Sequence, residues 1–414
     1  MARMSEQSAP VLPSSNYQLS WYNTGNALWM GSFSIQQLLV IWILVGILHE
    51  TPERVGFAQM LIAIPGLIFM LWGGVIGDRQ DGRQLLIQVH YLSAIPPLVL
   101  AIASIYGLIG FWLLIAAALV ANLLNSASNP ARNTILNRVA GNKLQFAISL
   151  STGIGSIASI AGTKIAGELD TLGLENVLYL QAAMFVLGAF FVARLTPAPP
   201  QAQIARESTL HTIRDGLAHV WRFKLARDLI GLNSLSGFFN AGAWLVAVPF
   251  IITRVYSGDA VLLANMTAVF YFGSLVATFG LLRFMPLARP GRLYLIMQCS
   301  RIPVLVILWL EPDLWLVWAA IAYWGFNMGV TTTMSRLMVQ EFASAEYRAR
   351  IMSIFILGMM AAVPVGSLVL GFIIGVWGPL DALVPGMMAS TLIFLLGYRR
   401  TDIWKYQSPG ARMS

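Results

Sequence analysis

The chain has 414 residues, of which 57% are hydrophobic and 11% are charged, and its mean hydropathy is +0.71. Soluble domains carry about 25% charged residues, so this composition excludes a water-soluble globular enzyme and indicates a polytopic membrane protein. The formal net charge is +8. The single cysteine, Cys299, excludes an intramolecular disulfide.

Apolar stretches of about 20 residues, the length that crosses a hydrocarbon core of about 30 Å, recur along the whole chain. They predict an all-α membrane protein of twelve transmembrane helices. The predicted spans are residues 24–48, 56–77, 85–106, 108–128, 146–168, 174–194, 228–253, 261–282, 293–310, 314–335, 351–376 and 380–398.

The break after the sixth span differs from the other loops. It begins with Pro197-Ala198-Pro199-Pro200 and continues with apolar residues at helical spacing, such as Leu210, Ile213 and Leu217. This pattern predicts a linker between two pseudo-symmetric six-helix bundles. The predicted division is a cytoplasmic tail (1–23), an N-terminal bundle (24–195), a cytoplasmic linker with an amphipathic helix (196–227), a C-terminal bundle (228–399) and a cytoplasmic tail (400–414).

The distribution of Lys and Arg predicts the orientation. If both termini are cytoplasmic, all but four of the 26 basic residues lie on the inner side; Arg54 and Arg254 lie outside, and Lys164 and Arg301 lie within spans. This bias is the positive-inside rule. We therefore expect a multi-pass protein of a bacterial inner membrane whose loops meet anionic lipid, and no nucleic-acid partner.

The two halves of the sequence resemble each other. Residues 81–83 match residues 290–292, residues 135–150 match residues 339–354, and Gly162 and Gly167 match Gly366 and Gly371. Internal repeats of six spans are typical of transporters that bind their substrate between the halves.

The loop after the second span reads Gly74-Val-Ile-Gly-Asp78-Arg79-Gln-Asp-Gly82-Arg83. It resembles the signature loop between the second and third helices of the major facilitator superfamily. Together with Pro130-Ala131-Arg132 and with Arg348-Ala349-Arg350, it is similar to the drug and siderophore exporter branch, the transmembrane secretion effector group that includes enterobactin and macrolide exporters. The resemblance covers about residues 26–398. It implies a gating motif made of Gly74, Asp78, Arg79, Gly82, Arg83, Arg348 and Arg350.

The same resemblance implies a function. We expect a secondary active transporter, a monomer, that exports a small amphipathic organic molecule, siderophore or drug-like, by alternating access, with protons as the coupling ion of an antiport. The alternatives are an uptake permease, a transporter or flippase of a lipid-like solute, and, in another class, a membrane sensor that does not transport. No hydrolase, phosphate-loop or metal pattern is present in the sequence, so we expect no enzyme activity, no catalytic residue, no metal and no cofactor.

The fifth span carries Gly153, Gly155, Gly162 and Gly167. This glycine-rich sequence is similar to the antiporter motif of superfamily exporters, but Thr163 stands where that motif has proline. The alternative is that these glycines serve close packing of spans five and eight, or of two and eleven.

If the superfamily arrangement holds, spans one, four, seven and ten line the substrate cavity. Amides and aromatic residues dominate near the centres of these spans. Such side chains orient a polar ligand and stack on its rings, although a buried amide also serves as an interhelical hydrogen bond. The candidate cavity residues are Gln36, Gln37, Asn122, Asn125, Asn240, Trp244, Tyr323 and Asn327.

Two cations lie within spans. A charge costs about 2.5 to 3.5 kcal/mol there, so each is expected to face protein or water. Lys164 is a candidate for anion recognition in the cavity, and its alternatives are snorkelling to the headgroups or pairing with Glu168. For Arg301, in the ninth span, we favour a structural role behind the bundle. No carboxylate lies near the middle of a span, so the sequence offers little support for proton coupling.

Overall fold

A computed structural model describes residues 16–72, 81–197, 220–221, 223–343 and 348–409. In this part of the chain every regular element is helical. The N-terminal half consists of α1 (Asn16–Trp42), η1 (Ile43–Ile47), α2 (Pro52–Trp72), α3 (Gly82–Ser93), α4 (Ile95–Ile105), α5 (Phe111–Ala140), η2 (Gly141–Lys143), α6 (Leu144–Gly167), α7 (Leu169–Leu172) and α8 (Leu174–Ala193).

The C-terminal half repeats the arrangement. It consists of α10 (Lys224–Ser236), η3 (Gly237–Ala241), α11 (Gly242–Arg254), α12 (Ala260–Leu282), α13 (Pro290–Trp309), α14 (Leu314–Phe342), α15 (Arg348–Trp377), η4 (Asp381–Leu383) and α16 (Val384–Arg399). The elements η1 and η3 are short π-helical segments in the first and seventh spans. The segment η1 ends the first span, whereas η3 lies between α10 and α11 of the seventh span.

The predicted fold class is confirmed. Eleven helical segments of the described residues are long and apolar enough to cross a membrane, and α2, with 21 residues, is the twelfth. The predicted ends of the fourth and tenth spans are wrong by several residues, because α5 continues to Ala140 and α14 to Phe342. Hydropathy marks where a helix leaves the hydrocarbon, and these two helices continue beyond that point.

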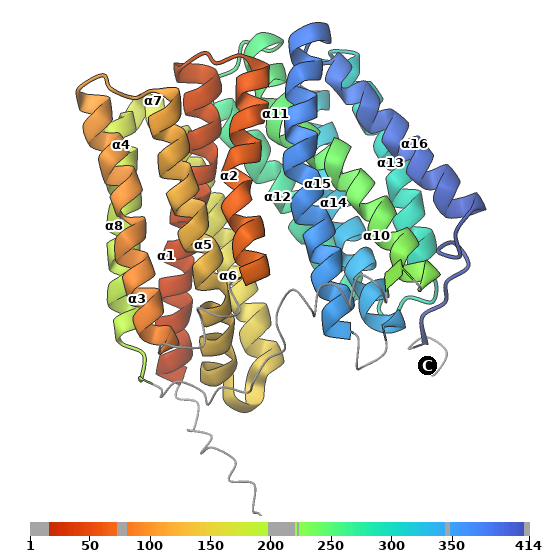
Figure 1. Ribbon diagram of the computed structural model, residues 1–414, viewed down its shortest axis with the longest axis horizontal. Helices are drawn as coiled ribbons and strands as arrows, with labels where there is room; N and C mark the ends of the chain where they lie inside the picture. Colours follow the sequence, from red (N-terminus) through yellow and green to blue (C-terminus); the bar gives the residue numbers. More distant parts are fainter. Residues whose placement is uncertain (1–15, 73–80, 198–219, 222, 344–347, 410–414) are drawn as a thin grey trace, which may run out of the picture.

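The two halves meet mainly at one end of the molecule. We call it the far end; it carries the connection from η1 to α2 and lies opposite the end from which α1 and the C-terminal tail extend, the near end (Figure 1). A single hydrophobic cluster joins both halves there, with Val55 and Leu178 from one half and Phe250 and Ile374 from the other. Toward the near end each half has its own clusters. The described conformation is therefore closed at the far end.

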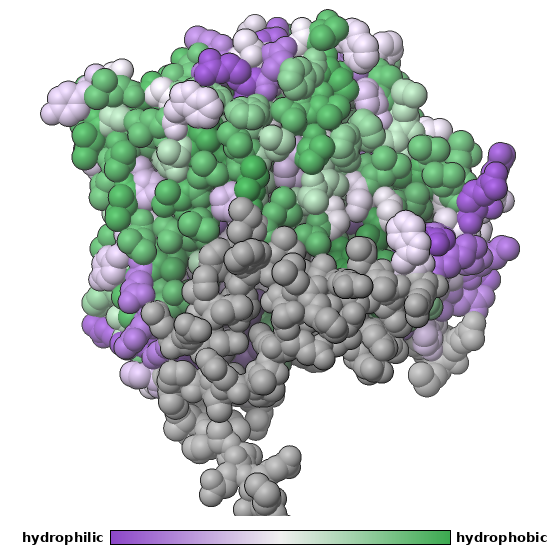
Figure 2. All heavy atoms as spheres, in the orientation of Figure 1, coloured by the Kyte–Doolittle hydropathy of each residue, from purple (hydrophilic) through white to green (hydrophobic). Residues whose placement is uncertain are grey.

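The surface carries the belt that a bilayer requires. Apolar residues cover the middle of the visible face, and polar residues gather along its upper edge and lower corners (Figure 2). Large apolar side chains are exposed on many helices, among them Ile157, Phe190 and Phe372. Since helices satisfy their own backbone hydrogen bonds, such a belt tolerates lipid on all sides.

Candidate functional site

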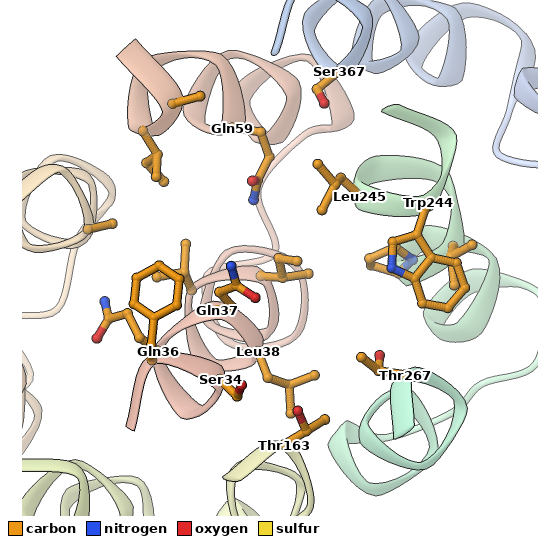
Figure 3. A pocket seen from close by; sticks show the side chains of 18 of the residues that line it. Ser34, Gln36, Gln37, Leu38, Gln59, Thr163, Trp244, Leu245, Thr267 and Ser367 are labelled. Atoms are coloured by element: carbon orange, nitrogen blue, oxygen red, sulfur yellow. The ribbon is translucent and has the colours of Figure 1, made fainter. Parts of the chain in front are cut away.

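A cavity of about 240 Å³ lies between the two halves. Helices α1, α2, α5 and α6 line it from the N-terminal half, and α11, α12 and α15 line it from the C-terminal half (Figure 3). Of the candidate residues from the sequence, it brings together Gln36, Gln37, Asn122 and Trp244. We call this space the central cavity.

The central cavity offers hydrogen-bond donors from amide side chains. Gln36 accepts from Nε2 of Gln181 at 2.7 Å through its Oε1, which leaves its own buried Nε2 with no partner among the described residues. Nε2 of Gln59 is also buried and has no partner among the described residues. The side chains of Gln37 and Gln59 extend into the space between the helices (Figure 3). A buried donor without an acceptor is unfavourable, so these amides suit a ligand that presents acceptors.

Two hydroxyl groups of the cavity already donate a hydrogen bond within their own helix. Thr267 donates to the carbonyl of Leu263 at 2.8 Å, and Ser367 donates to the carbonyl of Val363 at 3.0 Å. Because each hydroxyl hydrogen is already used within its own helix, these groups offer only lone pairs to a ligand. The unpartnered amide donors thus belong to α1 and α2, and these two hydroxyl acceptors belong to α12 and α15.

An aromatic group forms the wall on the side of α11. Trp244 stacks on Phe270, with ring centroids 3.8 Å apart and an interplanar angle of 18°, and meets Trp324 edge-on at 5.5 Å. Figure 3 shows the indole nitrogen on the side of the ring that faces α1. Held between two rings, Trp244 provides a rigid surface for a planar ligand.

No charged side chain lines the central cavity in the described part of the chain. Thr163 lines it, but the next residue, Lys164, is exposed and donates from Nζ to Oδ1 of Asn265 on α12. This contact joins the two halves near the far end. The structure therefore places the charge of Lys164 at the interface of the halves and outside the cavity.

Two further candidate residues serve buried polar networks. Oδ1 of Asn125 accepts from Nε1 of Trp29 at 3.2 Å and from Arg132 at 2.9 Å. Oδ1 of Asn327 accepts from Nε and a terminal nitrogen of Arg301 at 3.1 and 2.6 Å. Neither amide is among the residues that line the central cavity.

The remaining two also lie away from the cavity. Asn240 is buried one turn before Trp244, and neither of its amide atoms has a hydrogen-bond partner in the described ranges. Tyr323 is exposed and stacks on Phe326 with centroids 6.1 Å apart. Whether these residues act on a ligand stays a prediction.

The predicted gating motif is only partly described. Gly74, Asp78 and Arg79 lie outside the described residues, and so do the side chains of Arg348 and Arg350, which begin α15. Gly82 begins α3 and packs near Ala131 and Ile135 of α5. Arg83 donates through its side chain to the carbonyl of Ala193 at 2.5 Å. The described part thus ties the start of α3 to α5 and α8.

Glycines bring the two halves into contact at the far end. A Cβ added to Gly56 of α2 would lie 2.5 Å from the backbone oxygen of Ser367 and 3.1 Å from the Cα of Gly371. A Cβ on Gly167 of α6 would fall on Ala264 of α12. The close-packing interpretation of these glycines holds for spans two and eleven and for spans five and eight.

Sequence reasoning missed polar residues of the central cavity, among them Gln59, Thr267 and Ser367. They lie on spans two, eight and eleven, which were not expected to line it. For Gln59 a signal was present, because it is the only amide side chain in α2.

Comparison with known proteins identifies the family. The family model of the Major Facilitator Superfamily matches residues 24–367. The chain belongs to this superfamily. It is accordingly a membrane transporter rather than an enzyme. No curated protein sequence matches the chain.

Solved transporters of the superfamily share the fold. A variant of the nucleoside transporter NupG superposes with a TM-score of 0.74 at 14% identity, covering 92% of this chain and 99% of that one. A bacterial homologue of the human lysosomal transporter Spinster, inward-facing and unoccupied, gives 0.69 at 13% identity, with 93% and 96% covered. The human organic anion transporter MFSD10 gives 0.65 at 14% identity, with 93% and 100% covered. At such identities the likeness concerns the fold alone.

In a superfamily transporter the contact between Lys164 and Asn265 has a testable consequence. Lys164→Leu is expected to lower transport about two- to tenfold without changing solute affinity, because one hydrogen bond of about 0.5 to 1.5 kcal/mol then no longer holds the far end closed. Asn265→Leu should have the same effect, and the double variant should add nothing. Initial rates and half-saturation concentrations of the three variants check this. A loss of affinity for anionic solutes alone would instead place Lys164 in the binding site.

Proposed function

We propose that this transporter exports a small uncharged organic molecule, one that carries carbonyl or ring-nitrogen acceptors and a planar ring, by alternating access. The observation that carries the proposal is the uncharged central cavity, in which the unpartnered amide donor of Gln59 and the amide of Gln37 extend into the space between α1, α2 and the Trp244 surface (Figure 3). Amide donors recognise acceptors, and a neutral lining gives a formal charge no counter-ion. A neutral drug-like molecule suits this lining better than a carboxylate-rich siderophore.

The orientation and the gating motif belong to the same proposal. The distribution of basic residues supports cytoplasmic termini in a bacterial inner membrane, so the far end faces outward. The loop around Asp78, with Arg79 and the arginines at the start of α15, is proposed to hold the halves together on the cytoplasmic side when the far end opens. The two six-helix units, with boundaries at 24–195 and 228–399, then rock against each other, and we propose that one chain suffices.

Proton antiport is proposed from the resemblance. The lining of the central cavity includes no carboxylate or histidine in the described part of the chain, so a proton-carrying group has to lie outside this lining. Collapsing the proton gradient across vesicles tests the coupling directly. If export continues unchanged, the antiport is wrong.

The function is tested with purified protein in proteoliposomes and three probes of different charge. Uridine is a neutral planar carbonyl compound, tetraphenylphosphonium is a cation and citrate is an anion. We expect protein-dependent flux of uridine above that of the two ions. Flux of an ion alone would contradict the uncharged substrate class, and binding without flux would favour the sensor. Flux only toward the cytoplasm would favour the uptake permease.

The amide donors provide a prediction. Gln59→Leu and Gln36→Leu are each expected to raise the half-saturation concentration of a neutral carbonyl probe about tenfold, since one hydrogen bond of about 1.4 kcal/mol is lost. Gln88→Leu is the matched control, because Gln88 is exposed on α3 and is not a lining residue. Equal affinities for all four proteins would remove the two amides from substrate recognition.

A further inference from the structure

A second pocket, of about 530 Å³, opens at the far end between the halves. We call it the far-end pocket. His49 and Glu50 line it from the segment after η1, and Thr253, Arg254 and Asp259 line it from the end of α11 and the segment that follows. In contrast to the central cavity, this pocket carries charged side chains.

The two spaces lie one above the other along the same pair of helices. In the first span Ile41 lines the central cavity and Val45, four residues on, lines the far-end pocket. In α11 the same relation holds for Pro249 and Thr253. Residues four apart share a helix face and are separated by about one turn of 5.4 Å. Only about one turn of packed side chains therefore separates the spaces.

Trp42 is the largest side chain in that separating layer. It lines the floor of the far-end pocket and is only 7% exposed. Val40 and Val248 line the central cavity, and both are buried in the same cluster that contains Trp42. Phe250 closes the layer from the opposite half. These side chains come from both halves, so they separate whenever the far end opens.

The indole of Trp42 lies directly over Gly46. A Cβ at Gly46 would lie 2.5 Å from Cε2 and 2.7 Å from Cζ2 of the ring, so any larger residue there has to displace it. Gly46 belongs to the π-helical segment η1, a type of irregularity that is frequent at functional sites. Local geometry thus provides one defined position for the ring in the closed state.

We propose that Trp42 is the gate between the central cavity and the far-end pocket, and that the far-end pocket is the continuation of the transport path. The inference rests on the proposed function for its direction, and on the two pockets and the Trp42 position for its geometry. In the closed state the ring on Gly46 blocks passage. When the halves separate at the far end, Trp42 and Phe250 part and the two spaces merge.

The test needs no transported solute. In a Cys299→Ser background, which removes the single cysteine, Gln37→Cys places a thiol in the central cavity. A membrane-impermeant cationic methanethiosulfonate is applied from the far-end side, in intact cells or inside-out vesicles according to the orientation found. Trp42→Ala is expected to speed labelling at least tenfold, and Gly46→Ala should act in the same direction by displacing the ring. Labelling from the near-end side should stay unchanged, which also shows that the variants are folded.

Two further variants complete the test. Trp112→Ala, at a tryptophan that is 65% exposed on α5, should leave the far-end labelling rate unchanged. Adding Thr253→Trp to Trp42→Ala fills the far-end pocket and should slow labelling at least tenfold again. If Trp42→Ala and Gly46→Ala label at the parental rate, Trp42 is not the gate. If Thr253→Trp has no effect, the far-end pocket is not on the path. A failure of the proposed function would appear only in the solute assays.

Discussion

Gly56→Val is expected to reduce transport of every solute about tenfold or more. The valine Cβ would lie 2.5 Å from the backbone oxygen of Ser367, and neither backbone can yield without shifting α2 against α15. Overpacking of this kind costs about 1 to 3 kcal/mol, which corresponds to a shift of about 5- to 150-fold between two states. The closed far end becomes rarer while the central cavity keeps its lining. Steady-state flux normalised to folded protein measures the effect.

Its control is Gly153→Ala, because a Cβ on Gly153 of α6 meets no atom within 4 Å. This variant should transport at the parental rate. Gly56→Val should also expose a thiol at position 37 to reagents applied from the far-end side. Normal flux and a protected thiol in Gly56→Val would show that the contact between α2 and α15 does not close the far end.

Asn327→Leu is expected to lower the free energy of unfolding by about 3 kcal/mol or more. Asn327 is fully buried, and its Oδ1 accepts two hydrogen bonds from the guanidinium of Arg301, which is itself only 3% exposed. Leucine has a similar volume but no acceptor, so it leaves a buried cation short of partners, a change that typically costs 3 to 5 kcal/mol. Thermal unfolding in detergent measures the loss.

The double variant separates this cause from simple repacking. Arg301→Met removes the charge that Asn327 stabilises, so the combination with Asn327→Leu should recover a large part of the lost stability. Such coupling is what a double-mutant cycle measures. Additive losses would mean that Asn327 and Arg301 stabilise the fold independently. If Asn327→Leu lost solute affinity while its stability stayed unchanged, Asn327 would be a solute-binding residue and not a stabilising one.

Most of the fold follows from the sequence, because a bilayer core demands long apolar helices and tolerates few charges. The cavity follows only in part. Hydropathy fixes the depth of an amide in the membrane but not the direction in which its side chain points. Gln36 and Asn327 were therefore equivalent candidates, although one lines the central cavity and the other binds Arg301.

Gln59 was missed for a related reason. Spans two and eleven were not among the spans expected to line the cavity, but their glycines, Gly56 and Gly371, let the two backbones approach across the interface of the halves. A polar residue three positions after Gly56 is thereby brought to the inner surface. The inward position of Gln59 depends on how one half packs against the other, and this packing cannot be predicted from a single sequence.

The hydrophobic cluster shared by both halves at the far end implies different apparent affinities for solute on the two sides of the membrane. Opening that end exposes apolar surface to water at about 25 cal/mol for each Å², so the empty protein favours the state in which the central cavity is closed at the far end. A solute that arrives from the near end meets a competent site at once. One that arrives from the far end meets only the minor fraction of molecules that are open, and its apparent affinity falls by that fraction. Equal intrinsic binding on both sides would thus still give a lower half-saturation concentration from the near end, and a correspondingly lower maximal rate, because without an energy source the ratio of the two is the same in both directions.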